Sequence, residues 1–168
     1  MTAMAVSLRL ATLEDAKIIF DWRNDPWIVS LSSSQKTVTW QDHVAWLSKV
    51  LKDHNYQIYL IEHEGMDIGS VRFERKTMDS CDISVYLVRE QTGRGLGVEA
   101  IRQGCQEIIV DWNVKQIWAK IRDNNRHSKS AFQKAGFVAV TKKSNFIEEW
   151  VLSIDTIAVT STKKKYKQ

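Results

Sequence analysis

Three of the seven glycines lie on alternate positions, Gly93, Gly95 and Gly97, between an apolar run and a helical pattern. The run "CDISVYLV" precedes them, and apolar residues at helical spacing follow from Val98 onward. Glycine permits positive φ angles and a close approach to the backbone. The unpaired N–H groups and the positive end of the helix favour an anion there. We therefore expect a strand, a turn that binds an anion, and a helix.

The rest of the chain predicts a mixed α/β domain. Two T-x-x-D capping patterns open helices at Thr12 and Thr39, and Asn24-Asp-Pro26 is expected to end the first helix before a serine-rich loop. We expect about seven strands in a mostly antiparallel sheet flanked by about four helices. The expected strands are 6–11, 56–62, 67–75, 81–88, 115–121, 137–141 and 146–154, and the expected helices are 12–22, one from 39, 96–111 and 128–136.

Length and charge favour one domain over residues 1–158 with a basic, disordered tail over 159–168. The net charge is +4, but four lysines lie in the last six residues, and without them 20 basic residues balance 20 acidic ones. The folded part is then close to neutral, so we expect no nucleic-acid partner.

The two cysteines, Cys81 and Cys105, form neither a disulfide framework nor a zinc-binding pattern, and we expect no metal. The N-terminus lacks the basic segment of a signal peptide, and no apolar window is long enough to span a membrane. We expect a cytoplasmic protein with no membrane contact.

The glycine segment does not match two common phosphate-binding motifs well, the P-loop and the dinucleotide-binding motif. A P-loop needs G-x-x-x-x-G-K-[ST], and no lysine follows Gly97. Gly95-x-Gly97-x-x-Ala100 fits the dinucleotide pattern, but Arg89 to Thr92 separate the strand from the glycines, and too few residues follow 115–121 to complete such a sheet.

The segment "TGRGLG" instead resembles the [RQ]-x-x-G-x-[GA] signature of the GNAT superfamily of acetyl-CoA-dependent N-acetyltransferases. A second block, Asn125-x-x-Ser128-x-x-x-Phe132-x-x-x-Gly136-Phe137, is similar to that family's N-x-x-[SA]-x-x-x-Y-x-x-x-G-F pattern. The order of the expected elements is also that of a GNAT domain. The resemblance implies acetyl-CoA as cosubstrate and covers nearly the whole chain.

Two positions depart from the family pattern. Thr92 replaces Arg or Gln, which would shift one phosphate contact to Gln91 or Arg94, and Phe132 replaces the tyrosine that is often proposed to protonate the leaving thiolate. A thiol of pKa about 8.5 leaves without that help, and water or Tyr86 could return the proton. The resemblance implies a cofactor site made of Leu87, Val88, Thr92, Gly93, Arg94, Gly95, Leu96, Gly97, Val98, Asn125, Ser128 and Phe132.

Acetyl transfer to an amine requires a neutral amine and a donor for the developing oxyanion. Asp82, Ser84 and Glu74 are the polar candidates on the central strands, and Asp82 is the first choice for the general base. A carboxylate at the edge of a strand that simply faces solvent is the alternative for Asp82. His43 and His127 are less favoured, because a histidine on a helix is more often packed structure.

The first two helices and their loop are expected to bind the acceptor. Aromatic rings there can stack on a base or a sugar, and arginine can pair with phosphate. The tetrapeptide "WRND" resembles GNAT enzymes that acetylate amino-sugar nucleotides in nonulosonic (pseudaminic-type) acid pathways. The expected reaction is direct attack by the 4-amino group of a UDP-linked amino sugar in a ternary complex, by a monomer or homodimer. Candidate substrate residues are Trp22, Arg23, Asn24, His43 and Trp46.

Two alternatives remain at this point. Acetyltransferases of ribosomal-protein N-termini share a similar opening segment, so a peptide acceptor is the second candidate. A coenzyme A-binding module without turnover is the third, because Phe132 lacks the acidic group of tyrosine.

Overall fold

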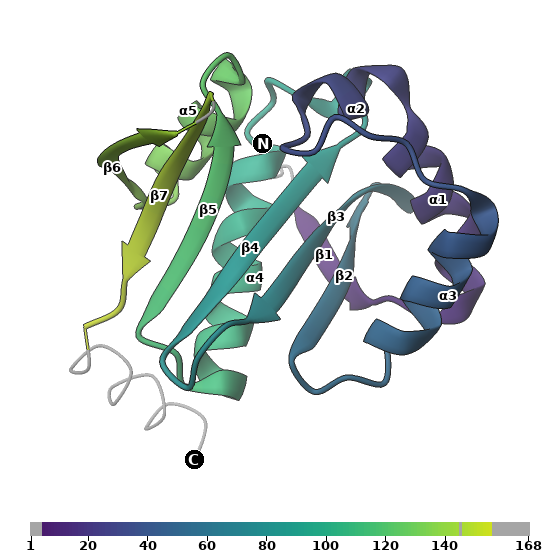
Figure 1. The fold of residues 1–168 in the computed structure, drawn as a ribbon, viewed down its shortest axis with the longest axis horizontal. Coiled ribbons are helices and arrows are strands. Elements are labelled where there is room, and N and C mark those ends of the chain that lie inside the picture. The colour runs from purple at the N-terminus through teal and green to yellow at the C-terminus, as the bar shows by residue number, and fades with distance from the viewer. Residues whose placement is uncertain (1–4, 145, 156–168) are drawn as a thin grey trace.

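The computed structural model describes residues 5–144 and 146–155 (Figure 1). The chain forms a seven-stranded sheet with helices on both faces, as expected for the GNAT fold. The strand order is β1-β2-β3-β4-β5-β7-β6, and only the β4–β5 pair is parallel. The expected basic tail, residues 159–168, lies outside the described residues.

The strands match the expected ones to within a few residues. They are β1 (Val6–Leu10), β2 (Tyr56–His63), β3 (Met66–Arg75), β4 (Ser80–Leu87), β5 (Gln116–Arg122), β6 (Val138–Ser144) and β7 (Ile147–Ser153). The β2–β3 turn has positive φ at Glu64 (50°) and Gly65 (77°), which is the backbone of a tight hairpin.

The described residues form five α-helices where four were expected. They are α1 (Ala16–Asn24), α2 (Pro26–Leu31), α3 (Trp40–Val50), α4 (Leu96–Trp112) and α5 (Arg126–Lys134). Helix α1 ends at Asn24 as predicted and a serine-rich loop follows Leu31, but the prediction missed α2 between them. Pro26 occupies the first turn of α2, and the Asp25 side chain caps this helix by accepting from the N–H groups of Trp27 and Ile28. Proline tolerates the first helical turn, where its missing N–H costs nothing.

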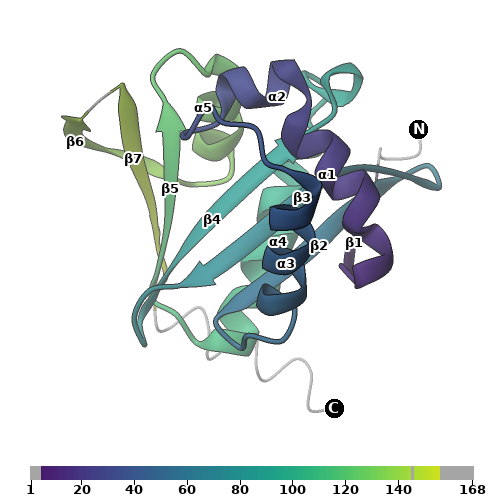
Figure 2. The ribbon, with the colours of Figure 1, turned by 45° about the vertical axis from the view of Figure 1, so that its right-hand side comes forward.

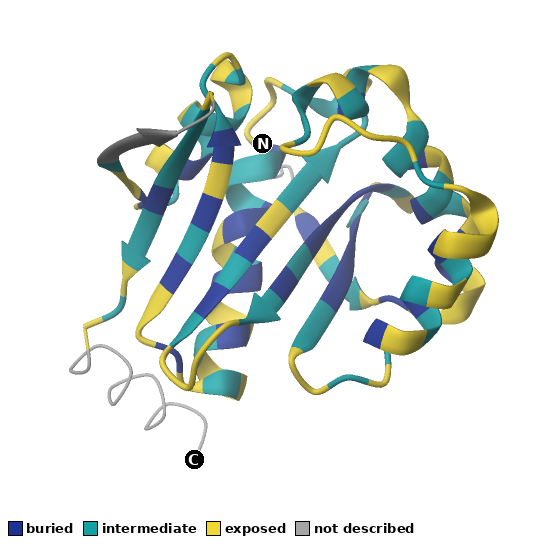
Figure 3. Ribbon diagram, in the orientation of Figure 1, coloured by how far each residue is buried: buried dark blue, intermediate teal, exposed yellow. Residues whose placement is uncertain are grey.

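Two apolar cores lie on opposite faces of the sheet (Figures 2 and 3). Helix α4 covers one face and buries Leu96, Ile101 and Ile108 against the strands. Helices α1 to α3 cover β2 on the other face, where Leu47 and Leu60 are fully buried. Burial of each such side chain contributes about 1.5–3 kcal/mol. Among the described residues, no helix is long and apolar enough to cross a membrane.

Candidate active site

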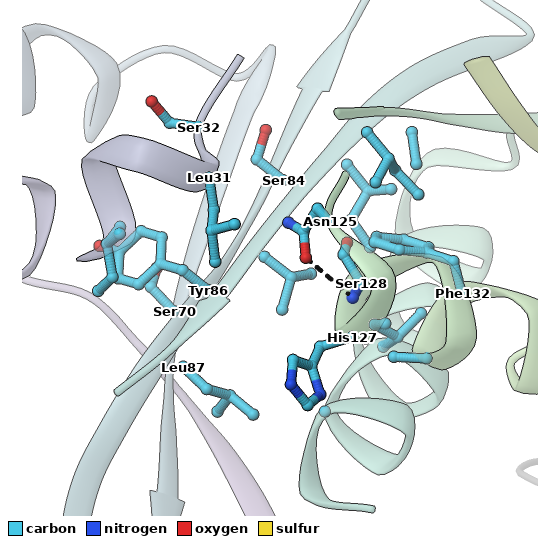
Figure 4. A pocket seen from close by; sticks show the side chains of 18 of the residues that line it. Leu31, Ser32, Ser70, Ser84, Tyr86, Leu87, Asn125, His127, Ser128 and Phe132 are labelled. Carbon is cyan, nitrogen blue, oxygen red and sulfur yellow. Dashed lines mark hydrogen bonds between the residues drawn. The ribbon is translucent and has the colours of Figure 1, made fainter. Parts of the chain in front are cut away.

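A cavity of about 500 Å³ opens where β4 and β5 diverge. Its walls come from the glycine segment and the start of α4, from α5, and from α1, α2 and the loop after α2. Figure 4 shows Ser84 and Leu87 on β4 between Leu31 and Ser32 of the α2 region and His127 and Ser128 of α5. Residues far apart in the sequence therefore meet at one opening in the sheet.

Because β4 and β5 diverge, the second half of β4 has no strand partner on the side that faces β5, although it stays paired with β3 on the other side. Their pairing extends only from Ser80 opposite Gln116 to Ile83 opposite Ala119. The Val88 N–H donates to Ile68 O at 2.8 Å. Since hydrogen-bonding direction alternates along an antiparallel pair, the polar groups of Leu87 face the gap. The Leu87 N–H thus points away from β3 toward the gap, where it can donate to a carbonyl oxygen.

The expectation for Val88 was wrong. Its N–H is bonded to β3, and its carbonyl oxygen accepts from the Gln91 N–H at 3.0 Å. A short 3₁₀ turn over Arg89–Gln91 follows directly. The hydrogen bond that the Val88 carbonyl oxygen accepts closes this turn.

The glycine segment has the geometry of an anion cradle. Gly93 (φ 73°) and Gly95 (φ 81°) are left-handed, and a Cβ atom at either would meet nothing within 4 Å. Gly93, Gly95, Gly97 and Val98 line the cavity at the N-terminus of the 17-residue helix α4. The first amides of a helix lack intrahelical partners. This segment fits the pyrophosphate of coenzyme A by its open space and its donors.

Three residues of the expected cofactor site support this loop from within. The Thr92 hydroxyl donates to Arg89 O at 2.7 Å, and Arg94 donates to Gln91 Oε1 at 2.6 Å. Leu96 is buried in the core under α4. Of the three, Thr92 alone lines the cavity.

Helix α5 supplies the opposite wall. The Asn125 side chain accepts from the Ser128 N–H at 3.2 Å and caps the helix (Figure 4). Asn125, Ser128 and Phe132 all line the cavity, as the resemblance implies. Phe132 is buried and packs edge-on against Phe137 with ring centroids 4.9 Å apart, so its place holds a ring without an acidic proton.

The three candidates for the general base lie on one face of the sheet, but only Ser84 lines the cavity. Glu74 is 2.7 Å from Lys76 Nζ. Burial opposes ionisation of Glu74, but hydrogen bonds from Lys76 and Tyr56 outweigh it and lower its pKa. Asp82 makes looser ion pairs, 3.8 Å to Lys76 and 3.7 Å to Lys120. Glu74 is therefore a weak base, and Asp82 does not line the cavity but lies two residues before Ser84 on the same face of β4.

Tyr86 also lines the cavity, beside Ser70 (Figure 4). Burial raises the pKa of Tyr86 to about 12. Since a thiol has a pKa of about 8.5, transfer of the tyrosine proton to a thiolate is unfavourable.

Of the five candidate substrate residues, Arg23 and Trp46 line the cavity. The other three form the structure behind the wall. Trp22 is buried with its ring 5.9 Å from that of Tyr86, and the Asn24 side chain forms two hydrogen bonds with the Val38 backbone, at 2.8 and 2.9 Å. His43 is buried and binds Ala16 O through Nε2 at 2.8 Å.

The cavity wall carries no acidic side chain in the part of the chain that the structure describes. Sequence reasoning missed most of its basic residues. Arg72 lies on the same face of the sheet as Ser84, its partner on β4. Strand alternation predicts that the two residues share a face, but it does not predict which face of the sheet carries the cavity. The basic residues of the wall are Arg23, Lys36, Arg72, Lys120, Arg126 and Lys134. No group of three or more His, Cys, Asp or Glu in 5–144 and 146–155 is placed to hold a metal ion.

The chain resembles several solved structures, and most of those named below are described as acetyltransferases. A domain from Methanocaldococcus jannaschii superposes with a TM-score of 0.78 at 20% identity, over 89% of this chain and 99% of that one. Spermidine N-acetyltransferase from Vibrio cholerae, in complex with CoA and spermine, gives 0.77 at 15% identity, over 88% and 95%. The aminoglycoside acetyltransferase AAC(6')-Ib, with coenzyme A and kanamycin, gives 0.76 at 23% identity, over 95% and 99%.

The N-acetyltransferase PseH of Campylobacter jejuni is also similar, with a TM-score of 0.67 at 16% identity, over 89% of this chain and 99% of that one. At these identities the likeness establishes the fold. No curated protein sequence matches the chain. The family model described as the acetyltransferase (GNAT) domain matches residues 6–138. The chain therefore belongs to the GNAT acetyltransferase family and is an acetyltransferase.

Proposed function

We propose that this enzyme acetylates the 4-amino group of a UDP-linked amino-deoxy sugar by direct attack in a ternary complex. One observation carries the proposal: a single cavity joins the glycine segment to α1 and α2, and its described lining is basic and lacks carboxylates. A phosphate-bearing acceptor would meet opposite charge along this wall.

A polyamine acceptor fits this wall poorly. Spermine and kanamycin are present in two of the similar structures, and each carries several amines that are protonated at neutral pH. Such a ligand is recognised best by carboxylates, and here it would face Arg23, Arg72 and Lys120 instead. The charge of this wall therefore disfavours a polyamine acceptor, although the fold is shared with those two enzymes.

The residues of the chain would divide the work as follows. The amides from Gly93 to Val98 would hold the pyrophosphate, and Asn125 and Ser128 would line the pantetheine arm. The Leu87 N–H would donate to the thioester carbonyl oxygen. Acetyl-CoA supplies the acetyl group as an activated thioester. Rings such as Trp27 and Trp46 on the cavity wall offer apolar faces to a base or a sugar.

The amine must lose a proton before it attacks. We propose that Ser84 contacts the amine and that Asp82, on the same strand and face, takes the proton through water. Its ion pairs of 3.7 and 3.8 Å are long enough to leave carboxylate lone pairs open to water. We further propose that the enzyme works in the cytoplasm, as a monomer or homodimer.

Thiol release from acetyl-CoA tests the acceptor class directly. The panel contains a UDP-4-amino sugar, the same amino sugar without UDP, spermidine, and short peptides with free N-termini. We expect release with the UDP-linked sugar alone. Release with peptides alone would favour an N-terminal acetyltransferase, and release with spermidine would refute the charge argument. Release at equal rates with and without UDP would refute nucleotide recognition.

A further inference from the structure

Two arginines from different elements meet on one tryptophan in the acceptor half of the cavity. The guanidinium carbon of Arg23, on α1, lies 4.5 Å from the centroid of the Trp46 ring, and that of Arg72, on β3, lies 5.6 Å from it. All three side chains line the cavity. We call Arg23 and Arg72 the arginine pair.

The arginine pair has no acidic partner among the described residues. Arg23 donates to His43 Nδ1 and Arg72 donates to Ser84 Oγ, both at a long 3.4 Å. Burial is the largest cause that lowers the pKa of Arg23, and the charge of Arg72 lowers it further. Two like charges are therefore held close together in a partly desolvated place.

Arg9 is a structural arginine of the same chain and contrasts with the arginine pair. It forms ion pairs with Asp15, Glu62 and Asp67 at 2.8, 3.3 and 2.9 Å. Hydrogen bonds to Asp15 and Asp67 raise its pKa. A guanidinium has five N–H donors in a fork that matches an oxyanion. Arg23 and Arg72 instead line a cavity whose described wall has no carboxylate, and each makes a side-chain contact at a long 3.4 Å.

We propose that the arginine pair binds a phosphate group of the acceptor and makes the enzyme selective for phosphate-bearing amines. Trp46 holds both guanidinium groups in place through cation–π contacts. Arg72 also touches Ser84, so the bound phosphate would lie within one side chain of the proposed amine position. This inference rests on the proposed function, and it assigns Arg72 a role in specificity.

Binding of UDP, uridine and inorganic pyrophosphate in the presence of saturating CoA tests the inference without turnover. Calorimetry is run on the wild type and on Arg23→Gln, Arg72→Gln and Arg72→Lys. Arg75→Gln is the matched control, because Arg75 lies on the same strand with its guanidinium carbon 4.8 Å from the Trp112 ring but on the other face of the sheet. Thermal unfolding confirms that each variant is folded.

We expect UDP and pyrophosphate to bind the wild type and uridine to bind far more weakly. Each Gln variant should weaken UDP binding at least tenfold, Arg72→Lys should weaken it less, and Arg75→Gln should leave it unchanged. Equal affinity for uridine and UDP, no binding of UDP or pyrophosphate to the wild type, or unchanged UDP binding in Arg72→Gln would overturn the inference.

The result is separable from the fate of the proposed function. Arginine-dependent UDP binding without acetylation of the UDP-amino sugar would retain the phosphate subsite and reject that acceptor. Acetylation of the UDP-amino sugar with an unchanged KM in both Gln variants would retain the acceptor and reject the subsite.

Discussion

Gly95→Ala isolates the contribution of the glycine segment to coenzyme A binding. Gly95 has φ 81°, and a Cβ atom built on it meets nothing within 4 Å. The folded protein therefore gains no clash, and the cost comes from the backbone. An L-residue in the left-handed region costs about 1–2 kcal/mol. For a domain of this size that lowers the melting temperature by about 2–8 °C.

The effect on coenzyme A should exceed the effect on stability. Gly95 lines the cavity, so its new methyl group would project where a phosphate oxygen needs to approach the amides. Loss of one hydrogen bond to a charged group costs about 1.5–3 kcal/mol, which is about a 10- to 100-fold rise in Kd. Isothermal titration with CoA measures this change.

Gly65→Ala is the control for Gly95→Ala. Gly65 has φ 77° and equally open surroundings, but it lies in the β2–β3 turn, away from the glycine segment. We expect the same loss of melting temperature and an unchanged Kd for CoA. If both variants bind CoA like the wild type, or if both lose binding equally, the assignment of the glycine segment to the pyrophosphate is refuted.

Four further predictions follow from individual contacts. Asp82→Asn should lower kcat by about 100-fold in the thiol-release assay, while Glu74→Gln lowers it by less than about threefold; the reverse order would make Glu74 the base. Gly69→Ala should lower the melting temperature more than Gly95→Ala does, because the Cβ atom of residue 69 would lie 2.1 Å from Tyr86 O. An unchanged melting temperature would contradict the tight approach of β3 and β4. Phe132→Tyr should change kcat by less than about threefold if the thiolate leaves unassisted, and a tenfold increase would show that protonation limits the rate. Burial lowers the pKa of His43 in the folded protein, so the unfolded chain binds a proton at this histidine more readily. The free energy of unfolding, measured by denaturation at a series of pH values, should therefore fall as the pH drops below about 6.5. The same dependence of stability on pH in His43→Gln would rule His43 out as the cause.

Local sequence predicts the elements well because the signals for them are local. Alternating apolar residues give the β2–β3–β4 meander, and the T-x-x-D pattern places the start of α3 at Trp40, with Thr39 Oγ1 accepting from the Asp42 N–H. The failure at α2 has an equally local cause. Asn24-Asp-Pro26 was correctly interpreted as the end of the first helix, but an aspartate cap followed by proline also begins α2 at once, and this second role was missed.

The candidate site was predictable where one short segment builds it. Gly93, Gly95, Asn125 and Ser128 lie on the cavity wall as their motifs imply, because a loop and a helix N-terminus carry their own donors. Val88 was assigned wrongly, since its hydrogen bonds depend on the register of β3 and on the turn that follows β4.

What the sequence alone determined is the turn of the glycine segment before α4 and the family, because both rest on residues close together in the chain. Tertiary structure decided the acceptor side, where α1, α3 and β3 bring Arg23, Trp46 and Arg72 to one place. No pattern along the chain links these residues, and their shared environment arises only from how the helices pack on the sheet. The missing carboxylates are likewise a property of the assembled wall, because the chain as a whole has 20 acidic residues and the fold places none of those it describes on that surface.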